Sequence, residues 1–145
     1  MTIEQLAEFA GNHPGLFIAL GVVLGLLVWN LLASQISGIK SLLPQEAIFL
    51  VNREDAIILD VREENEYAQG HILNSVHIPL STLSSKTGRI EKYRSRPIIA
   101  SCMSGNRSGQ ACNLLKKNGF EKMHNLKGGI IAWQNASLPL TKKKT

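Results

Sequence analysis

The sequence predicts an α/β fold, an open and mostly parallel β-sheet with helices on both faces, preceded by one transmembrane helix. Two observations lead to this prediction. Short apolar segments alternate with helical patterns over residues 40–140, and an almost purely apolar run occupies residues 16–32. Short strands that are apolar throughout are typical of a parallel sheet buried on both faces. A chain of 145 residues is long enough for one such domain with its own core.

The strands of the sheet are expected in the short apolar segments, which are residues 56–60, 76–78, 97–101 and 122–125. Helices are expected in the periodic segments around them, which are residues 44–52, 63–69, 88–93, 108–118 and 130–135. Gly119 is expected to end one helix, and Gly128 with Gly129 to form a tight turn before the last one. Ligands of such sheets bind beyond the carboxyl ends of the strands.

The apolar run of residues 16–32 has Asn30 as its only strongly polar side chain. At ~1.5 Å per residue, about 17 residues span ~26 Å, which is just enough to cross a bilayer. A signal peptide is disfavoured because residues 1–15 contain acidic residues and no basic one, and a buried core helix is the other alternative. No Lys or Arg precedes Lys40, so the domain is expected on the cytoplasmic side of a bacterial inner membrane, held by a single span.

The chain is therefore expected to have several parts in sequence. They are a short amphipathic segment (1–15), the transmembrane helix (16–33), a small polar linker (34–39), the α/β domain (40–140) and a basic tail (141–145). The first segment begins with Thr2-Ile3-Glu4-Gln5, a pattern typical of a helix start, and it suits a helix at a lipid surface. The lysines of the tail are expected to be solvated, with contact to anionic lipid as the alternative.

The composition excludes several classes of function. The net charge of +5 comes from basic residues scattered among acidic ones without interleaved aromatic residues, so nucleic-acid binding is not expected. The two cysteines do not suggest a disulfide framework, and a reducing compartment is their natural location. The histidines show no ligand spacing with each other or with the cysteines, so neither a metal nor a cofactor is expected.

Cys102 lies where the apolar segment 97–101 changes to Met103, Ser104, Gly105, Asn106, Arg107 and Ser108. We call residues 102–108 the cysteine loop. At a strand-to-helix junction the backbone N–H groups lack partners, and small residues let several of them converge on one sulfur. These groups, with Arg107 nearby, predict a thiol pKa below the usual ~8.5 and a nucleophile at neutral pH. A buried cysteine with a packing role is the alternative.

Several short motifs in residues 40–140 occur in an order that resembles the rhodanese-like sulfurtransferases. They are Asp60-Val61-Arg62, Glu66-Tyr67, Gly70-His71-Ile72 with Asn74-Ser75 and His77-Ile78-Pro79, the cysteine loop, and Gly128-Gly129 with Ala132-Trp133. With the apolar N-terminal run, the whole chain resembles the YibN-type, membrane-anchored single-domain rhodaneses of bacteria.

The resemblance implies that Cys102 takes sulfane sulfur from a small donor, holds it as a persulfide and passes it to a thiol or another nucleophile, with a protein as a possible donor or acceptor. It also implies that six residues from Cys102 to Arg107 suit sulfur, whereas longer loops occur in phosphatase relatives. Arg107 is the only charged loop residue, so a persulfide is expected to be a better donor than dianionic thiosulfate. Asp60 and Arg62 either orient the loop from behind or form an ion pair that only fixes the fold.

Two other functions stay open at this point. A membrane-tethered protein-docking module would have little turnover, and the intact cysteine loop disfavours it. A cysteine phosphatase or arsenate reductase would use the same kind of loop, and the short loop disfavours it. Cys112 lies in a predicted helix near Leu114 and Leu115, so a packing role is favoured over a role as a resolving thiol.

Overall fold

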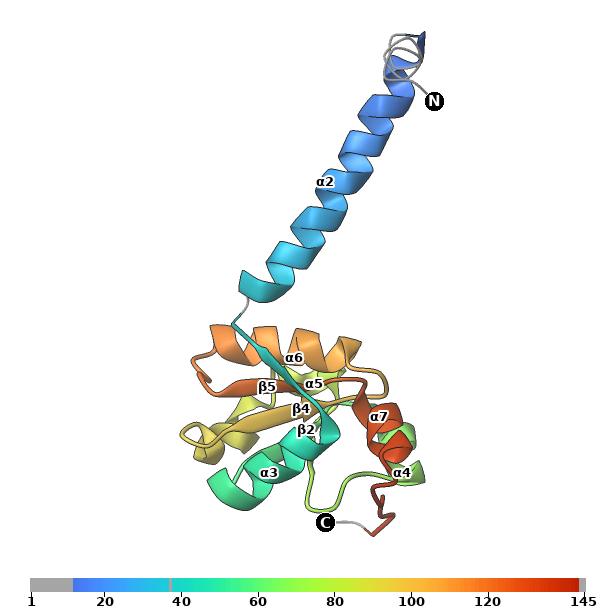
Figure 1. Cartoon of the computed structure of the whole chain (residues 1–145). Helices are drawn as coiled ribbons and strands as arrows, with labels where there is room; N and C mark the ends of the chain where they lie inside the picture. The colour runs from blue at the N-terminus through green and yellow to red at the C-terminus, as the bar shows by residue number, and fades with distance from the viewer. Residues whose placement is uncertain (1–11, 37, 144–145) are drawn as a thin grey trace. The chain divides into compact units, whose positions relative to one another are not determined.

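The structure is a computed structural model that describes residues 12–36 and 38–143, without the side chains of residues 31–36. The chain divides after Gly38 into two compact units (Figure 1). The expected helix start at residues 2–5 and the end of the basic tail, residues 144–145, lie outside the described residues.

The N-terminal unit contains the helix α2, Pro14–Ile36. Within the part of the chain that the structure describes, no helix combines the length and the apolar character needed to cross a membrane. The transmembrane helix predicted for residues 16–33 is therefore not supported. α2 also includes residues 34–36, which were expected in the linker, because Ser and Gln are compatible with a helix.

The C-terminal unit is built on a sheet whose strands all run parallel. The strands are β1 (Lys40–Leu42), β2 (Ile57–Asp60), β3 (Val76–His77), β4 (Ile98–Ser101) and β5 (Met123–Leu126), in the order β1-β5-β4-β2-β3. β4 is therefore the central strand, and its carboxyl end lies between those of β5 and β2. β1 was not predicted, because a three-residue strand with only Leu42 buried shows no recognisable period.

Helices connect these strands. They are α3 (Pro44–Glu54), α4 (Glu64–Gln69), α5 (Leu80–Leu83), the 3₁₀ helix η1 (Thr87–Tyr93), α6 (Asn106–Lys117) and α7 (Gly129–Asn135). Only α5 was missed, because a helix of four residues is too short to show a period. α6 begins at Asn106 rather than at the predicted Ser108, so Arg107 lies in its first turn. Gly105 precedes the helix with a φ of +102°, a conformation that glycine adopts without steric cost.

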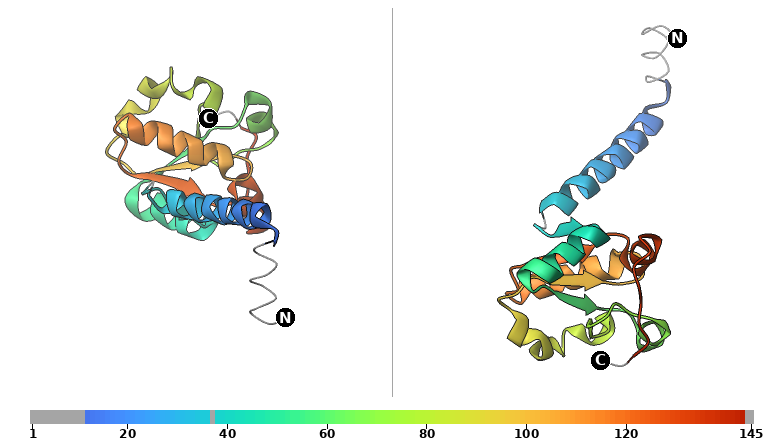
Figure 2. Two further views of the ribbon diagram at one scale, coloured as in Figure 1. Left: turned by 90° about the horizontal axis from the view of Figure 1, so that it is seen from above. Right: turned by 60° about the horizontal axis from the view of Figure 1, so that its bottom comes forward.

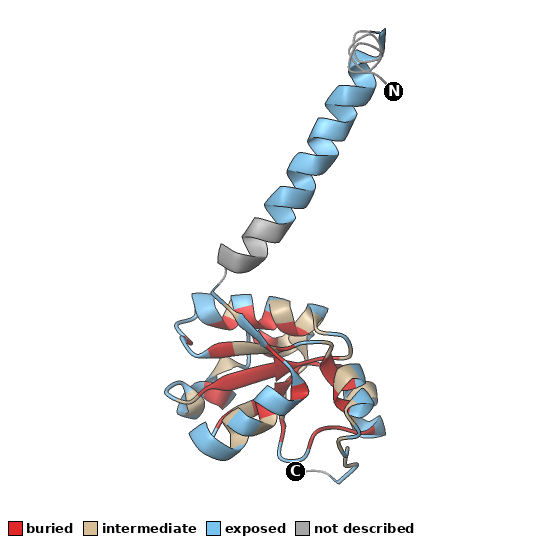
Figure 3. Ribbon diagram, viewed as in Figure 1, coloured by how far each residue is buried: buried red, intermediate tan, exposed pale blue. Residues whose placement is uncertain are grey.

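The side chains of the strands alternate between two core layers. In β4, Ile98 and Ala100 pack in the layer formed with α5, η1 and α6, and Ile99 packs in the layer formed with α3 and α7. Figure 1 and Figure 2 show α6 and α3 on opposite faces of the sheet, and Figure 3 shows that the inner strands β2 and β4 are buried. Burial on both faces explains why the inner strands β2 and β4 are largely apolar. The prediction of a parallel sheet with helices on both faces is confirmed.

Candidate functional site

Cys102 follows the central strand β4 and precedes α6, at the carboxyl edge of the sheet. The end of the strand is held by β2, because the Val61 amide donates to the Ser101 carbonyl oxygen at 2.9 Å. Cys102 is only 1% exposed and belongs to the core layer that α6 covers. The predicted nucleophile therefore lies where parallel sheets bind ligands, at the base of a loop rather than on the surface.

The shape of the cysteine loop depends on α7, which packs against it. The amides of Ile130 and Ile131 donate to the carbonyl oxygens of Cys102 (2.8 Å) and Met103 (3.2 Å). Gly129 permits this approach, because a Cβ at that position would lie 2.2 Å from the Cys102 oxygen, and its φ is +55°. With these carbonyl groups directed at α7, the later amides of the loop can face the sulfur.

The Cys102 sulfur meets hydrogen-bond donors from the start of α6. The Gly105 amide lies 3.1 Å from Sγ, and Ser108 Oγ lies 3.3 Å from it. Burial raises the pKa of the Cys102 thiol, but the Ser108 hydroxyl and the amides of Ser108, Gly105 and Ser104 together lower it by more, so the pKa lies below its ordinary value. A larger fraction of Cys102 is therefore thiolate at neutral pH than for a free cysteine, which suits a nucleophile.

The charge of Arg107 is paired with Glu66 of α4. Arg107 Nη1 and Nη2 each donate to one carboxylate oxygen of Glu66 at 2.6 Å, which gives a two-bond fork. The hydrogen bonds from Arg107 lower the pKa of Glu66 to about 2, so the pair is charged at neutral pH. The sequence predicts that Arg107 adds positive potential at the sulfur. Because a carboxylate balances that charge, the loop amides supply most of the field at Sγ instead.

Asp60 and Arg62 form a buried ion pair at the end of β2, where they are 1% and 2% exposed and Arg62 Nη2 lies 2.7 Å from Asp60 Oδ2. Arg62 also donates to the carbonyl oxygens of Glu66 (3.2 Å) and Gly70 (2.8 Å). Across the described residues, neither side chain forms a hydrogen bond to the cysteine loop. The pair therefore holds α4 on the sheet, and it affects the loop through Glu66 rather than directly.

The remaining loop side chains lie near the surface. Ser104 and Asn106 are exposed, and Met103 is half-buried. A small pocket of about 160 Å³ opens beside the loop and is lined by Arg62, Glu66, Gln69, Gly70, Met103, Ile130, Gln134 and Leu140. Apart from the Arg62 and Glu66 charges this lining is neutral, which suits a small ligand with an uncharged organic part.

Asn125 is a site residue that the sequence analysis missed. It lies on β5 opposite Ala100 of β4, and its side chain reaches the inner side of the cysteine loop. Its Nδ2 donates to the Gly105 carbonyl oxygen at 3.0 Å, and its Oδ1 accepts a hydrogen bond from Ser108 Oγ at 2.6 Å. The available signal was its position near the carboxyl end of a predicted strand, which in a parallel sheet lies beside the other strand ends.

Cys112 has a different environment from Cys102. It is fully buried in α6, and its thiol donates to the His124 carbonyl oxygen at 3.2 Å. Burial raises the pKa of Cys112 to about 12, and both cysteines are free thiols. Cys112 is therefore an unreactive packing residue. In the described part of the chain, no three His, Cys, Asp or Glu side chains are grouped closely enough to hold a metal ion.

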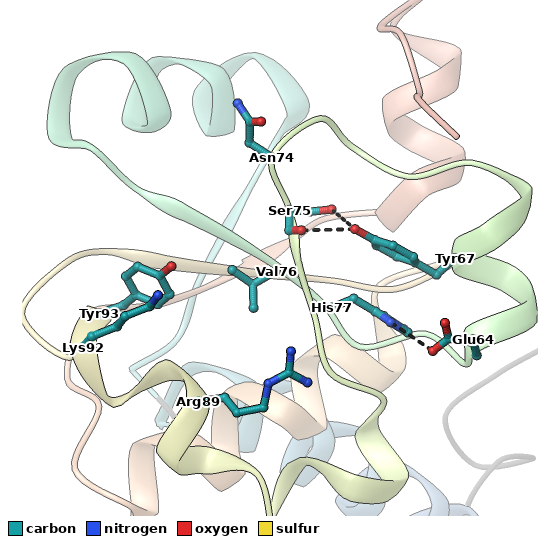
Figure 4. Close-up of a pocket in the computed structure, with 9 residues that line it drawn as sticks. All are labelled: Glu64, Tyr67, Asn74, Ser75, Val76, His77, Arg89, Lys92 and Tyr93. Carbon is teal, nitrogen blue, oxygen red and sulfur yellow. Dashed lines mark hydrogen bonds and ion pairs between the residues drawn. The ribbon is translucent and has the colours of Figure 1, made fainter. Parts of the chain in front are cut away.

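A separate pocket of about 590 Å³ lies along the edge strand β3. Figure 4 shows the residues that line it, which are Glu64, Tyr67, Asn74, Ser75, Val76, His77, Arg89, Lys92 and Tyr93. The Glu64 carboxylate lies 3.5 Å from the His77 ring on one side, and Arg89 and Lys92 come from η1 on the other. None of these residues belongs to the cysteine loop.

Comparisons with known proteins agree with this geometry. A family model described as the rhodanese-like domain matches residues 43–136. The chain is 32% identical over 143 residues to the uncharacterised protein YibN of Escherichia coli K12. The matched region covers 98% of this chain and 100% of YibN. It is 37% identical over 91 residues to a sulfurtransferase of Allochromatium vinosum. The matched region covers 63% of this chain and 83% of that relative.

Solved structures show the same fold. A rhodanese-related protein from Thermoplasma volcanium has a TM-score of 0.64 and 30% identity, covering 72% of this chain and 99% of its own. The family model spans more than half of the chain, and the cysteine loop occupies the carboxyl end of the central strand. This chain therefore belongs to the rhodanese-like domain family.

Proposed function

We propose that this protein is a sulfurtransferase that carries sulfane sulfur on Cys102 as a persulfide, between a small donor and a thiol or another nucleophilic acceptor. The observation that carries the proposal is the position of Cys102 Sγ, 3.1 Å from the Gly105 amide and beside the Ser108 hydroxyl. Fixed donors of this kind stabilise an anion without transferring a proton. The name of the Allochromatium vinosum relative, a sulfurtransferase, supports the same function.

The reaction balances without a redox partner. The Cys102 thiolate attacks the outer sulfur of a donor R–S–S⁻, so that an S–S bond forms to Sγ and the S–S bond of the donor breaks, with R–S⁻ as the leaving group. An acceptor thiolate R′–S⁻ then attacks the outer sulfur of the Cys102 persulfide. The products are R′–S–S⁻ and the Cys102 thiolate. Since every intermediate is anionic at sulfur, the chemistry needs hydrogen-bond donors rather than a base or a cofactor.

The test is mass spectrometry of the full chain after incubation with a small persulfide donor. We expect one added sulfur atom on the peptide that contains Cys102, and loss of that sulfur when a thiol acceptor is added. Cys102→Ser should abolish both the added sulfur and the turnover. Cys112→Ser is the matched control and should retain both, because Cys112 is buried and has a pKa of about 12.

Two results would contradict the proposal. If the Cys102→Ser protein turned over as fast as the parent, Cys102 would not be the nucleophile. Cys102-dependent hydrolysis of phosphate esters or reduction of arsenate, without any sulfur uptake, would assign the loop to the other chemistry that such cysteine loops support. A protein donor or acceptor is part of the proposal and would be detected as sulfur transfer from or to a second polypeptide.

The cellular location stays a prediction. The inner face of a bacterial membrane was expected from the apolar run of residues 16–32 and from the absence of Lys and Arg before Lys40. Alkaline carbonate extraction of cell membranes tests attachment to the bilayer. Protease added to intact spheroplasts then tests on which side of the membrane the domain lies, because a cytoplasmic domain is cleaved only after the cells are opened.

A further inference from the structure

We propose that Asn125 is a positioning residue that receives the Ser108 hydroxyl hydrogen whenever Cys102 Sγ carries no negative charge. The Ser108 hydrogen bond then alternates between Cys102 Sγ and Asn125 Oδ1, as the charge moves between Sγ and the outer sulfur of the persulfide. The inference rests on the proposed function, because it concerns the two forms of Cys102 in that reaction.

Ser108 has two acceptors and one hydrogen to donate. Its Oγ lies 2.6 Å from Asn125 Oδ1 and 3.3 Å from Cys102 Sγ. A hydroxyl group can donate to only one of these acceptors at a time. Ser108 is fully buried in the first turn of α6, so its hydrogen-bond partners come from the protein. Asn125 and Cys102 therefore compete for the same hydrogen.

Asn125 is held in the orientation that this competition requires. Its Nδ2 donates to the Gly105 carbonyl oxygen at 3.0 Å, which leaves Oδ1 to face Ser108. Asn125 comes from β5, the neighbour of β4, so its backbone is fixed in the sheet. One amide side chain thus contacts Gly105 and Ser108, which both donate to Sγ.

The charge on Sγ decides which acceptor receives the hydrogen. A hydrogen bond to an ionised acceptor is about twice as strong as one between neutral groups, so the thiolate attracts the Ser108 hydrogen. In the persulfide Sγ is a neutral divalent sulfur and a weak acceptor, and the amide oxygen of Asn125 receives the hydrogen instead. Without Asn125, the buried Ser108 hydroxyl has no good acceptor in the persulfide form, which is unfavourable. Asn125 therefore favours the persulfide over the thiolate.

The first measurement is the rate at which iodoacetamide alkylates Cys102 as a function of pH, in the full chain without any sulfur donor. Asn125→Ala should lower the thiol pKa by about 0.5 to 1 unit, because the Ser108 hydrogen becomes fully available to the thiolate. Asn125→Asp should raise the pKa, because a carboxylate holds the hydrogen more strongly and adds a negative charge. Ser108→Ala should also raise it. Asn118→Ala, at the far end of α6, is the control and should change nothing.

The double variant separates this competition from a merely structural role of Asn125. In the Ser108→Ala background, Asn125→Ala should leave the Cys102 pKa unchanged, because no shared hydrogen remains. If Asn125 only shapes the loop at Gly105, then Asn125→Ala and Asn125→Asp will shift the pKa in the same direction, or the Asn125→Ala shift will persist without Ser108. Either result overturns the proposal. Thermal unfolding curves of each variant confirm that the domain is folded during the measurement.

The second measurement is the ratio of Cys102 persulfide to thiolate at a fixed ratio of small persulfide to thiol, read by mass spectrometry. Asn125→Ala should lower this ratio about three- to tenfold, and an unchanged or higher ratio overturns the proposal. Failure of the proposed function is distinguishable, because the parent protein would then take up no sulfur at all. The alkylation series needs no sulfur donor and would still decide whether Asn125 and Cys102 compete for the Ser108 hydrogen.

Discussion

Cys102 and Cys112 lie in the same apolar cluster, and their exposed fractions are 1% and 0%. Their acid strengths nevertheless change in opposite directions. The pKa of Cys102 lies below its ordinary value, whereas burial raises the pKa of Cys112 to about 12. Burial opposes the charged form at both positions, so burial cannot explain why the pKa of Cys102 is lowered.

The difference lies in the groups that face each sulfur. Cys102 Sγ faces the Gly105 amide and the Ser108 hydroxyl, which donate hydrogen bonds. Cys112 Sγ faces the His124 carbonyl oxygen, which can only accept one. A carbonyl oxygen stabilises a thiol and repels a thiolate, and an amide does the opposite. The groups around the sulfur at the end of β4 therefore stabilise a thiolate, and the carbonyl group beside the sulfur within α6 does not.

The largest expected effect is the difference in reactivity between the two thiols. In the folded protein at neutral pH, Cys102 should be alkylated at least about a thousandfold faster than Cys112, because a thiol with a pKa near 12 is almost never ionised. Iodoacetamide labelling followed by peptide mapping measures both rates in one sample. In guanidinium chloride the two rates should become similar. Equal alkylation rates in the folded protein would contradict the difference in pKa between the two thiols.

The next effect concerns the contact between α7 and the Cys102 carbonyl group. Gly129→Ala should lower the free energy of unfolding by about 2–4 kcal/mol, because its Cβ has no space beside the Cys102 oxygen and its φ is +55°. The variant should also slow alkylation of Cys102 without affecting Cys112. Urea denaturation gives the free energy. Gly88→Ala is the matched control, because nothing lies within 4 Å of a Cβ there. Equal stability of both variants would contradict this account of the loop.

A smaller effect is expected on the choice of sulfur donor. If amide dipoles rather than net charge stabilise the anion at Cys102, a small persulfide should exceed thiosulfate in kcat/KM by about tenfold, or ~1.4 kcal/mol of transition-state free energy. Arg107 does not offset the second charge of thiosulfate, because Glu66 already pairs with it. Steady-state kinetics with both donors test this preference. A tenfold advantage for thiosulfate would mean that Arg107 acts on the donor after all.

The smallest effect is the stability that the Glu66–Arg107 pair contributes. The folded-state pKa of Glu66 is lowered from 4.5 to about 2, so this stability is present above about pH 4.5 and is lost as the pH falls toward 2. For a pair that is partly exposed we expect about 1 kcal/mol. Unfolding free energies of the parent and of Glu66→Gln, measured from pH 7 to pH 2, should converge in acid. Curves that diverge in acid would contradict the lowered pKa, and Glu121→Gln, at an exposed position, controls for general charge effects.

The sequence alone determined the order of most strands and helices and the place of Cys102 between a strand and a helix. These features depend on residues that lie close together in the sequence. The period of the apolar side chains predicts the strands and helices, and the small residues after Cys102 predict the loop. A strand as short as β1 carries no period, so the sequence did not predict it.

Only the tertiary structure decided how the site is completed. Glu66 reaches Arg107 across 41 residues of sequence, and Asn125 reaches Ser108 across 17. The amides of α7 meet the Cys102 and Met103 carbonyl groups only because Gly129 allows close approach. The sequence left two roles open for Asp60 and Arg62, and the structure shows an ion pair that holds α4 on the sheet. Such contacts depend on the path of the whole chain, because the sheet order brings β5 beside β4, and no local pattern of residues encodes that order.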